Sequence, residues 1–383
     1  MVCNEVPKNE CCCSCSAGPW FSSGNSNHLK VLIINDYAAT IGGAERFLEN
    51  LLYESQHAAI DFHRLNITDL VQGSGTAAWS NVITDRMKRI RVIPEMVSWI
   101  THQVELIKPD LIHLNNNHLY TNSVVQSLRS SGIPVVWFVH DECTLRRMRS
   151  VFYLQTNNSF TFLTHSPQIY NGLTSMQRKA YLVKVPFNHT KWTLPPEEVI
   201  RHRSSDILYV GRIEKSKGIF TLVKAVDLIK AKVSSINLTI LGDGSQLKAL
   251  ESMVKARKLT HNIRIIGLQE DQELRRYYAS ARILVFPSGT ETLGYVGLEA
   301  QACGTPVIAF KNEGTIRWCR DNVSGFIVQG TSPQKLADKV LEIIHDDVIL
   351  TRISTAAREN IRLEGYNASS HEVPDIYKAI LSW

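Results

Sequence analysis

The sequence predicts an α/β protein made of two domains, each built on a parallel sheet. The first observation is length, because 383 residues are too many for one ordinary hydrophobic core. The second is the alternation of short apolar runs with amphipathic stretches in both halves of the chain, which is typical of parallel sheets with crossover helices. A hydrophobic fraction of 44% fits a globular protein, and no apolar run is long enough to span a bilayer.

Shifts in composition divide the chain into five predicted segments. The beginning is polar and rich in cysteine, so we expect an unstructured extension. A stretch around Pro195-Pro196 has little periodicity and is interpreted as a linker. The segments are residues 1–27 (extension), 28–188 (first domain), 189–204 (linker), 205–368 (second domain) and 369–383 (C-terminal helix).

Within the domains, apolar runs of strand length predict the sheets. In the first domain the predicted strands are Leu29–Ile34, Ile60–Leu65, Asp110–Leu114, Ile133–Val139, Phe160–Thr164 and Tyr181–Val185. In the second domain they are residues 206–210, 236–241, 263–266, 281–286 and 307–310. Helices are predicted at residues 219–229, 246–256, 334–344, 349–363 and 373–383, with Ser216 as the N-cap of the first of these.

Five of the eight cysteines lie in the first fifteen residues, and no histidine lies among them as a partner for a zinc site. We interpret them as part of the unstructured extension, with lipidation or metal capture as a minor alternative. All eight fit a reducing cytoplasm.

A net charge of +6 favours an anionic ligand or a membrane surface, and no nucleic-acid-binding motif accompanies it, so no nucleic-acid partner is expected. The basic run Asp85–Arg91 is interpreted as a solvated face. The sharper alternative is an acceptor-side surface for anionic lipid, with peripheral contact at the inner membrane surface.

The stretch after predicted strand 281–286 places two carboxylates around a helix start. Glu291 lies on the loop, and Glu299 lies a little over one turn into the next helix. The residues between them present backbone N–H groups where the helix dipole favours an anion; these residues are Thr292, Leu293 and Gly294. Each glutamate alone would more simply be a surface residue. Together they suit a ligand with hydroxyls at both ends and a phosphate in the middle, such as a nucleotide-sugar.

Other predicted strands deliver polar or flexible residues to the same edge of their sheets. Gly42-Gly43 follows the first strand and lets backbone approach a ligand at a helix start. His140 ends strand 133–139, where ligand contacts lie in open parallel sheets. Arg212 and Lys217 follow strand 206–210 and offer two cations for two linked phosphates, although a second lysine two residues earlier leaves the choice of lysine open.

These residues carry a resemblance to a known family. The spacing Glu291-(seven residues)-Glu299, followed by Gly304-Thr305-Pro306-Val307, resembles the signature of retaining glycosyltransferases of family 4, the glycosyl transferases group 1. Gly42-Gly43-Ala44-Glu45 is similar to the family's N-terminal loop, and Gly211-Arg212-(four residues)-Lys217-Gly218 to its diphosphate-binding motif. The resemblance covers roughly Lys30 to Trp383. It implies the GT-B fold, in which two Rossmann-like domains face each other across a cleft.

The resemblance also implies a reaction and a set of roles. A sugar would pass from a nucleotide-sugar, UDP-linked, to a hydroxyl of a glycan, lipid or small molecule, with retention of anomeric configuration. Arg212 and Lys217 would hold the diphosphate, Glu299 the ribose, and Glu291 and His140 the sugar. The turns at Gly242 and Leu268 would border the nucleoside, and the last helix would cross back onto the first domain.

No Asp-x-Asp motif is present, so we expect neither a metal nor another cofactor, only the nucleotide-sugar as substrate. Two alternatives stay open. One is a nucleotide-sugar 2-epimerase or a sugar phosphorylase on the same fold, and the other is a non-catalytic sugar-nucleotide-binding protein.

Overall fold

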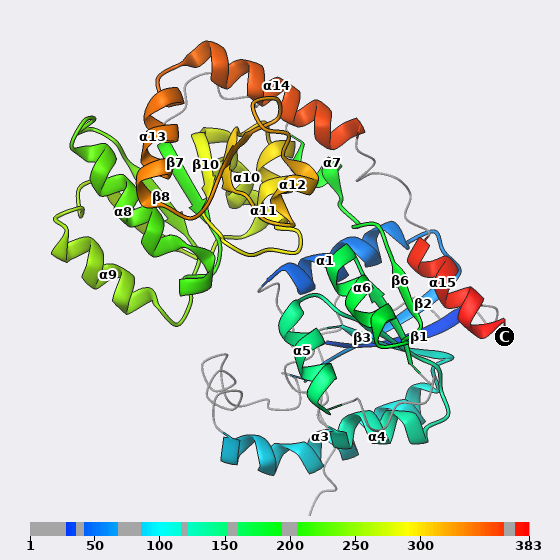
Figure 1. Ribbon diagram of the computed structural model, residues 1–383. Helices are drawn as coiled ribbons and strands as arrows, with labels where there is room; N and C mark the ends of the chain where they lie inside the picture. Colours follow the sequence, from blue (N-terminus) through cyan, green and yellow to red (C-terminus); the bar gives the residue numbers. More distant parts are fainter. Residues whose placement is uncertain are drawn as a thin grey trace, which may run out of the picture.

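The structure is a computed structural model that describes residues 28–35, 42–67, 86–115, 122–151, 160–193, 205–363 and 372–382. It forms two lobes, each with a central sheet between layers of helices (Figure 1). The extension predicted at residues 1–27 and most of the linker predicted at 189–204 lie outside the described residues. None of the described helices is both long and apolar enough to cross a membrane.

The first domain contains a six-stranded sheet in the order β2-β1-β3-β4-β5-β6, and every printed pairing is parallel. Its strands are β1 (Leu29–Asn35), β2 (Ile60–Asn66), β3 (Leu111–Asn115), β4 (Val135–Phe138), β5 (Phe160–Thr164) and β6 (Ala180–Leu182). Its helices are α1 (Gly43–Glu54), α3 (Arg86–Ile107), α4 (Asn122–Ser130), α5 (Glu142–Val151) and α6 (Pro167–Ser175).

The second domain repeats this plan with a parallel sheet in the order β12-β11-β10-β7-β8-β9. Its strands are β7 (Ser205–Val210), β8 (Leu238–Leu241), β9 (Ile263–Gly267), β10 (Ala281–Phe286), β11 (Val307–Phe310) and β12 (Phe326–Val328). Its helices are α8 (Ile219–Lys230), α9 (Leu247–Ala256), α10 (Asp271–Ser280), α11 (Tyr295–Ala302), α12 (Thr315–Trp318), α13 (Pro333–Ile343) and α14 (Asp347–Leu363).

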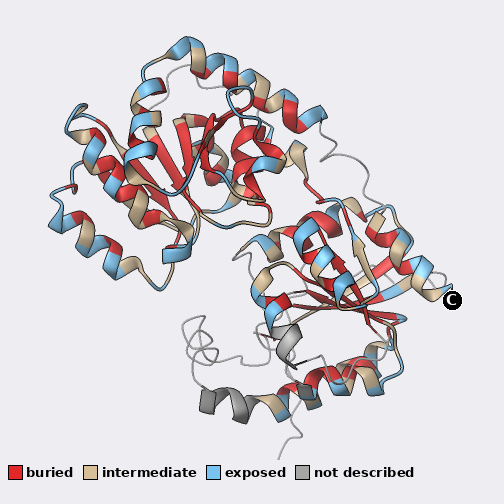
Figure 2. Ribbon diagram, viewed as in Figure 1, coloured by how far each residue is buried: buried red, intermediate tan, exposed pale blue. Residues whose placement is uncertain are grey.

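The apolar strands are explained by helices on both faces of each sheet. Successive side chains of a strand point to opposite faces. In β1, Val31 and Ile33 enter one hydrophobic core, and Leu32 and Ile34 enter the other. A strand covered on both sides must be apolar at every position, which is why it reads as a continuous run and not as an alternating pattern. Figure 2 shows the buried strands inside and the exposed helix faces outside.

Two elements tie the domains together. The short helix α7 (His189–Trp192) buries Trp192 completely, and the indole packs against Tyr278 of the second domain. The C-terminal helix α15 (Glu372–Leu381) returns to the first domain, where the Tyr377 hydroxyl is hydrogen-bonded to Nδ1 of His113 (Figure 1). Both contacts are buried, so each belongs to a packed core and not to a solvent-exposed tether.

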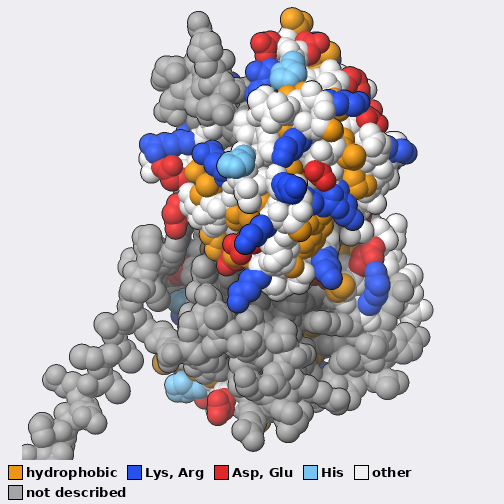
Figure 3. Space-filling model, turned by 90° about the vertical axis from the view of Figure 1, so that its left-hand side faces the viewer, with side chains coloured by type: hydrophobic (Ala, Val, Ile, Leu, Met, Phe, Trp, Pro, Cys, Tyr) orange, Lys and Arg blue, Asp and Glu red, His pale blue; other side chains and the backbone are white. Residues whose placement is uncertain are grey.

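The charged side chains of the second domain are dispersed. On the face shown in Figure 3, lysine and arginine side chains lie among acidic and apolar ones and do not gather into one continuous patch. The basic run 85–91 begins outside the described residues and continues into α3. Its interpretation as a solvated face or a lipid-binding surface therefore stays a prediction.

Candidate functional site

The site is built on tight loops at the carboxyl ends of β7, β8 and β10. Gly242 follows β8 with a φ of +139°, and a Cβ atom there would lie 2.0 Å from the carbonyl oxygen of Gly211, which follows β7. Only glycine allows two neighbouring loops to cross this closely. Leu268, which follows β9, is 72% exposed. The predicted turn at Gly242 thus lies beside the loop that carries Arg212.

The loop after β7 packs directly on the loop after β10. Gly218 has a φ of +72°, and a Cβ atom there would lie 1.8 Å from the carbonyl oxygen of Pro287. Gly218 is also the N-cap of α8, because residues 215–217 form a turn of 3-10 helix before it. The prediction that Ser216 caps this helix is therefore wrong: the left-handed backbone that the close approach requires favours a glycine cap.

This packing brings Lys217 to Glu291. The Nζ atom of Lys217 lies 2.5 Å from Oε1 of Glu291, and the two side chains are 24% and 14% exposed. Lys215 and Arg212 are both exposed. The structure therefore distinguishes the two lysines that the sequence left open: Lys217 is the one held beside the predicted sugar-binding carboxylate. Arg212 lies on the same loop.

Residues 314–318 hold the loop from Glu291 to Gly294 by hydrogen bonds to its carbonyl groups. The N–H groups of the loop lie at the start of α11. The carbonyl oxygen of Glu291 accepts from the Gly314 amide at 2.8 Å, and the carbonyl oxygen of Leu293 accepts from Nε1 of Trp318 at 2.7 Å. Gly294 has a φ of +89° and caps α11. Within the described part of the chain, no group accepts from the amides of Thr292, Leu293 and Gly294. This is the arrangement that binds anions at helix starts.

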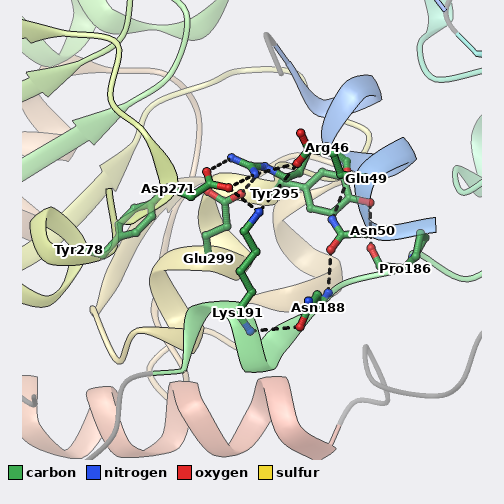
Figure 4. Close-up of polar contacts among 10 residues, drawn as sticks. All are labelled: Arg46, Glu49, Asn50, Pro186, Asn188, Lys191, Asp271, Tyr278, Tyr295 and Glu299. Atoms are coloured by element: carbon green, nitrogen blue, oxygen red, sulfur yellow. Dashed lines mark hydrogen bonds and ion pairs between the residues drawn. The ribbon is translucent and has the colours of Figure 1, made fainter. Parts of the chain in front are cut away.

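Glu299 occupies the predicted place in α11 but is buried. Its Oε1 atom lies 3.0 Å from Nε of Arg46, and its Oε2 atom accepts from the Tyr278 hydroxyl at 2.9 Å. Arg46 comes from α1 of the first domain and also donates two hydrogen bonds to Asp271, at 2.8 and 2.9 Å (Figure 4). Burial raises the pKa of Glu299, and the guanidinium of Arg46 opposes that shift.

Arg46, Asp271 and Lys191 were not predicted as site residues. Lys191 forms an ion pair with Asp271. One signal was available for Arg46. It lies in the first turn of a helix, where a positive charge is unfavourable with respect to the helix dipole and needs a compensating partner. Here the partners are Glu49 of the same helix and two carboxylates of the second domain, Asp271 and Glu299, so two of the three ion pairs join the two domains.

The first domain contributes His140 and Gly42-Gly43. The carbonyl oxygen of His140 accepts from the Thr292 hydroxyl at 3.0 Å. Gly42 caps α1, and a Cβ atom at Gly43 would lie 3.9 Å from the ring of Tyr295, the first residue of α11. The starts of α1 and α11 therefore face each other, and the backbone of His140 lies against the loop from Glu291 to Gly294. Among the described residues, no cluster of His, Cys, Asp and Glu could hold a metal ion.

Residues 190–360 match the family model described as "Glycosyl transferases group 1". This part of the chain is therefore similar to the group 1 glycosyltransferases. The chain is 25% identical over 346 residues to the uncharacterized glycosyltransferase MJ1178 of Methanocaldococcus jannaschii, which covers 86% of this chain and 93% of that protein. It is 38% identical over 157 residues to D-inositol 3-phosphate glycosyltransferase of Paenarthrobacter aurescens, which covers 39% of this chain and 37% of that protein.

Solved structures show the GT-B fold for the whole described chain. The sucrose-phosphate synthase of Thermosynechococcus elongatus superposes with a TM-score of 0.74 at 18% identity, over 93% of this chain and all of that one. Anabaena Alr3699/HepE, solved in complex with UDP-glucose, has a TM-score of 0.71 at 16% identity, over 92% of this chain and all of that one. The predicted fold class, two Rossmann-like domains facing across a cleft, is confirmed.

Proposed function

We propose that the chain is a group 1 glycosyltransferase that transfers a sugar from a UDP-linked donor to an acceptor hydroxyl with retention of configuration, as in glycosyltransferase family 4. One observation carries the proposal. Lys217 and Glu291 meet 2.5 Å apart beside the helix start at Gly294, and Thr292 of the same loop is hydrogen-bonded to His140 of the other domain. A cation, a carboxylate and the N–H donors of the second domain therefore lie beside the backbone carbonyl group of His140 of the first domain. UDP and UDP-glucose in structures of the same fold support the choice of nucleotide.

Each group has a role that its chemistry allows. Lys217 and the exposed Arg212 would hold the diphosphate, together with the amides of the α11 start. Glu291 would accept from a sugar hydroxyl, and His140 would contact the sugar near C6. Glu299 would accept from the ribose. Because Glu299 is only 2% exposed and is covered by Arg46, we expect the Arg46 side chain to shift when the donor binds.

In the proposed step, the bond between the anomeric carbon and the diphosphate oxygen breaks, and the electron pair leaves with the diphosphate. The acceptor oxygen attacks from the same face, and its proton goes to the departing phosphate oxygen. Negative charge grows on the diphosphate in the transition state, where Arg212, Lys217 and the helix-start amides stabilise it. No side chain of the site is assigned as a covalent nucleophile, and we expect activity to be unchanged by a metal chelator.

The test is incubation of the purified chain with UDP-sugars and a cell extract, with mass spectrometry of the products. Proton NMR of the new anomeric centre then reports the configuration. A new glycoside that keeps the donor's configuration supports the proposal, and an inverted product overturns its retaining part. Consumption of free phosphate would indicate a phosphorylase, and isomerisation of the sugar without an acceptor a 2-epimerase. Binding of UDP-sugar without any turnover would indicate a non-catalytic binding protein.

A further inference from the structure

A chain of buried carboxamides ends on the imidazole of His140. Asn35 at the end of β1 and Asn115 at the end of β3 are both completely buried. Nδ2 of Asn115 donates to Oδ1 of Asn35 at 2.8 Å and to the carbonyl oxygen of Ala44 at 3.2 Å. Oδ1 of Asn115 lies 2.7 Å from Nε2 of His140. All three polar side chains belong to the first domain, and none of them is part of the predicted nucleotide contacts.

The partners determine which way the Asn115 amide points. A backbone carbonyl oxygen can only accept, so the atom of Asn115 that faces Ala44 must be the nitrogen. The atom that faces His140 is then the oxygen, which also can only accept. Nε2 of His140 must therefore carry a hydrogen. When the imidazole is neutral, Nδ1 is left as a lone-pair acceptor.

Thr292 determines a second tautomer by the same reasoning. Its hydroxyl has one hydrogen, which goes to the carbonyl oxygen of His140 at 3.0 Å. The Thr292 oxygen can then only accept from Nε2 of His165, 3.2 Å away. His165 is thus also an Nε2–H imidazole, and its Nδ1 atom is buried without a partner in the described part of the chain.

The surroundings keep His140 neutral. Its ring packs on Phe138, with the centroids 4.4 Å apart, and edge-on against Phe47 at 5.3 Å. The titratable groups that act on it from the neighbouring strands are His165 and His113. Burial lowers the pKa of His140 well below its usual value, and the two other histidines lower it further. Among the described residues, none donates to Nδ1 of His140, so this atom is able to accept a hydrogen bond from a bound ligand.

We propose that Asn115 is a positioning residue that fixes His140 as an Nε2–H imidazole, and that this selects donors with a free hydroxyl at C6. The inference rests on the proposed function, in which His140 contacts the sugar near C6. A C6 hydroxyl can donate to the lone pair of Nδ1. A hexuronate would present a carboxylate, which has no hydrogen to donate and repels the lone pair. A 6-deoxy sugar would leave Nδ1 unpaired.

Two measurements test the tautomer of His140 and the donor specificity separately. First, 15N NMR of the histidine-labelled wild-type protein should show a protonated Nε2 and an unprotonated Nδ1 for His140, assigned with His140→Gln. Second, kcat/KM for UDP-glucose should exceed that for UDP-glucuronate by at least about tenfold, because a polar site strongly rejects a ligand that leaves its groups unpaired. This ratio should not change across the working pH range, since His140 stays neutral.

Asn115→Asp should weaken the preference for UDP-glucose at low pH. A carboxylate beside Nε2 favours the charged imidazole, so the pKa of His140 rises. Below that raised pKa, Nδ1 carries a hydrogen and can donate to a carboxylate. We expect the UDP-glucose to UDP-glucuronate ratio of Asn115→Asp to fall as pH is lowered and to recover as pH rises through the imidazole titration seen by NMR. Asn171→Asp, which adds the same charge at an exposed position of α6, should keep the wild-type ratio.

An Nδ1–H tautomer in the wild-type spectrum overturns the inference whether or not Asn115→Asp folds. A second outcome is that the tautomer is as inferred while the UDP-glucose to UDP-glucuronate ratio of Asn115→Asp does not change as His140 titrates. In that case Nδ1 does not face the sugar, and the role of His140 in the proposed function is wrong. If both donors are bound but neither is turned over, the transferase proposal fails while the tautomer result stands.

Discussion

Replacing Arg46 with methionine tests whether the ion pairs between the domains hold the structure together. Methionine keeps an unbranched apolar stem but removes the charge. Among the described residues, the carboxylate of Glu299, whose side chain is 3% exposed, would then keep only the Tyr278 hydroxyl as a direct partner. Breaking a buried ion pair from one side costs about 3–5 kcal/mol. Lys191 remains nearby and still favours the charged carboxylate, so we expect a loss at the lower end, about 3 kcal/mol.

The assay is urea unfolding followed by tryptophan fluorescence, because the Arg46 guanidinium lies 5.2 Å from the ring of the buried Trp192. The matched control is Arg276→Met, which breaks an exposed pair with Glu273 in which the arginine side chain is 66% exposed. Such a surface pair contributes about 0–1 kcal/mol. The double variant Arg46→Met/Glu299→Gln should recover part of the loss, since it removes the unpaired charge. Equal unfolding midpoints for Arg46→Met and Arg276→Met would refute the reasoning.

The same variant should show a pH dependence of definite sign. The folded-state pKa of Glu299 is raised, and removing Arg46 raises it further. A group with a raised folded pKa contributes stability that is fully present below its unfolded pKa and is lost as pH rises through the folded pKa. The stability deficit of Arg46→Met relative to wild type should therefore shrink as the pH falls toward the ordinary glutamate pKa of 4.5. A deficit that grows with acidity would contradict the assignment.

Three further predictions concern the site. Arg212→Ala and Lys217→Ala should each cost about 1.5–3 kcal/mol of transition-state stabilisation in kcat/KM, with little change in melting temperature; unchanged activity in both would rule out the phosphate role. In calorimetry, Glu299→Gln should weaken nucleoside diphosphate and full donor alike, whereas Glu291→Gln should weaken the donor only; equal loss of nucleotide affinity would mean that the ligand lies the other way round. Gly218→Ala should lower the melting temperature sharply, because its Cβ would lie 1.8 Å from a backbone carbonyl oxygen; a wild-type melting curve would show that this loop can open.

Most of the strands could be predicted because their signal is local. Predicted strands 160–164, 281–286 and 307–310 match β5, β10 and β11 residue for residue. Each is a short apolar run between turn residues, which is how a strand buried on both faces must read. The carboxyl ends of these strands were predictable for the same reason. Glu291 and His140 were predicted as site residues because each follows the carboxyl end of a predicted strand.

Several helices had no clear local signal. The helix α3 begins with a basic run and contains Pro94, so its pattern does not read as a regular amphipathic helix. The helix α10 is strongly charged, and only Leu274, Tyr278 and Ala279 are buried in it. The helix α5, which begins two residues after His140, also has a mostly polar sequence. Tertiary packing on a few apolar side chains is enough to hold such helices.

The sequence by itself determined the two parallel sheets, the glycine turns at their ends, and the pair of glutamates around the start of α11, because backbone preference and burial act over a few neighbouring residues. Only the tertiary structure decided that Lys217 and not Lys215 meets Glu291, that Arg46 covers Glu299, and that Asn115 orients His140. Each of these contacts joins residues from different strand ends or different domains. Their geometry depends on how the two sheets are placed in space, and no local pattern encodes that placement.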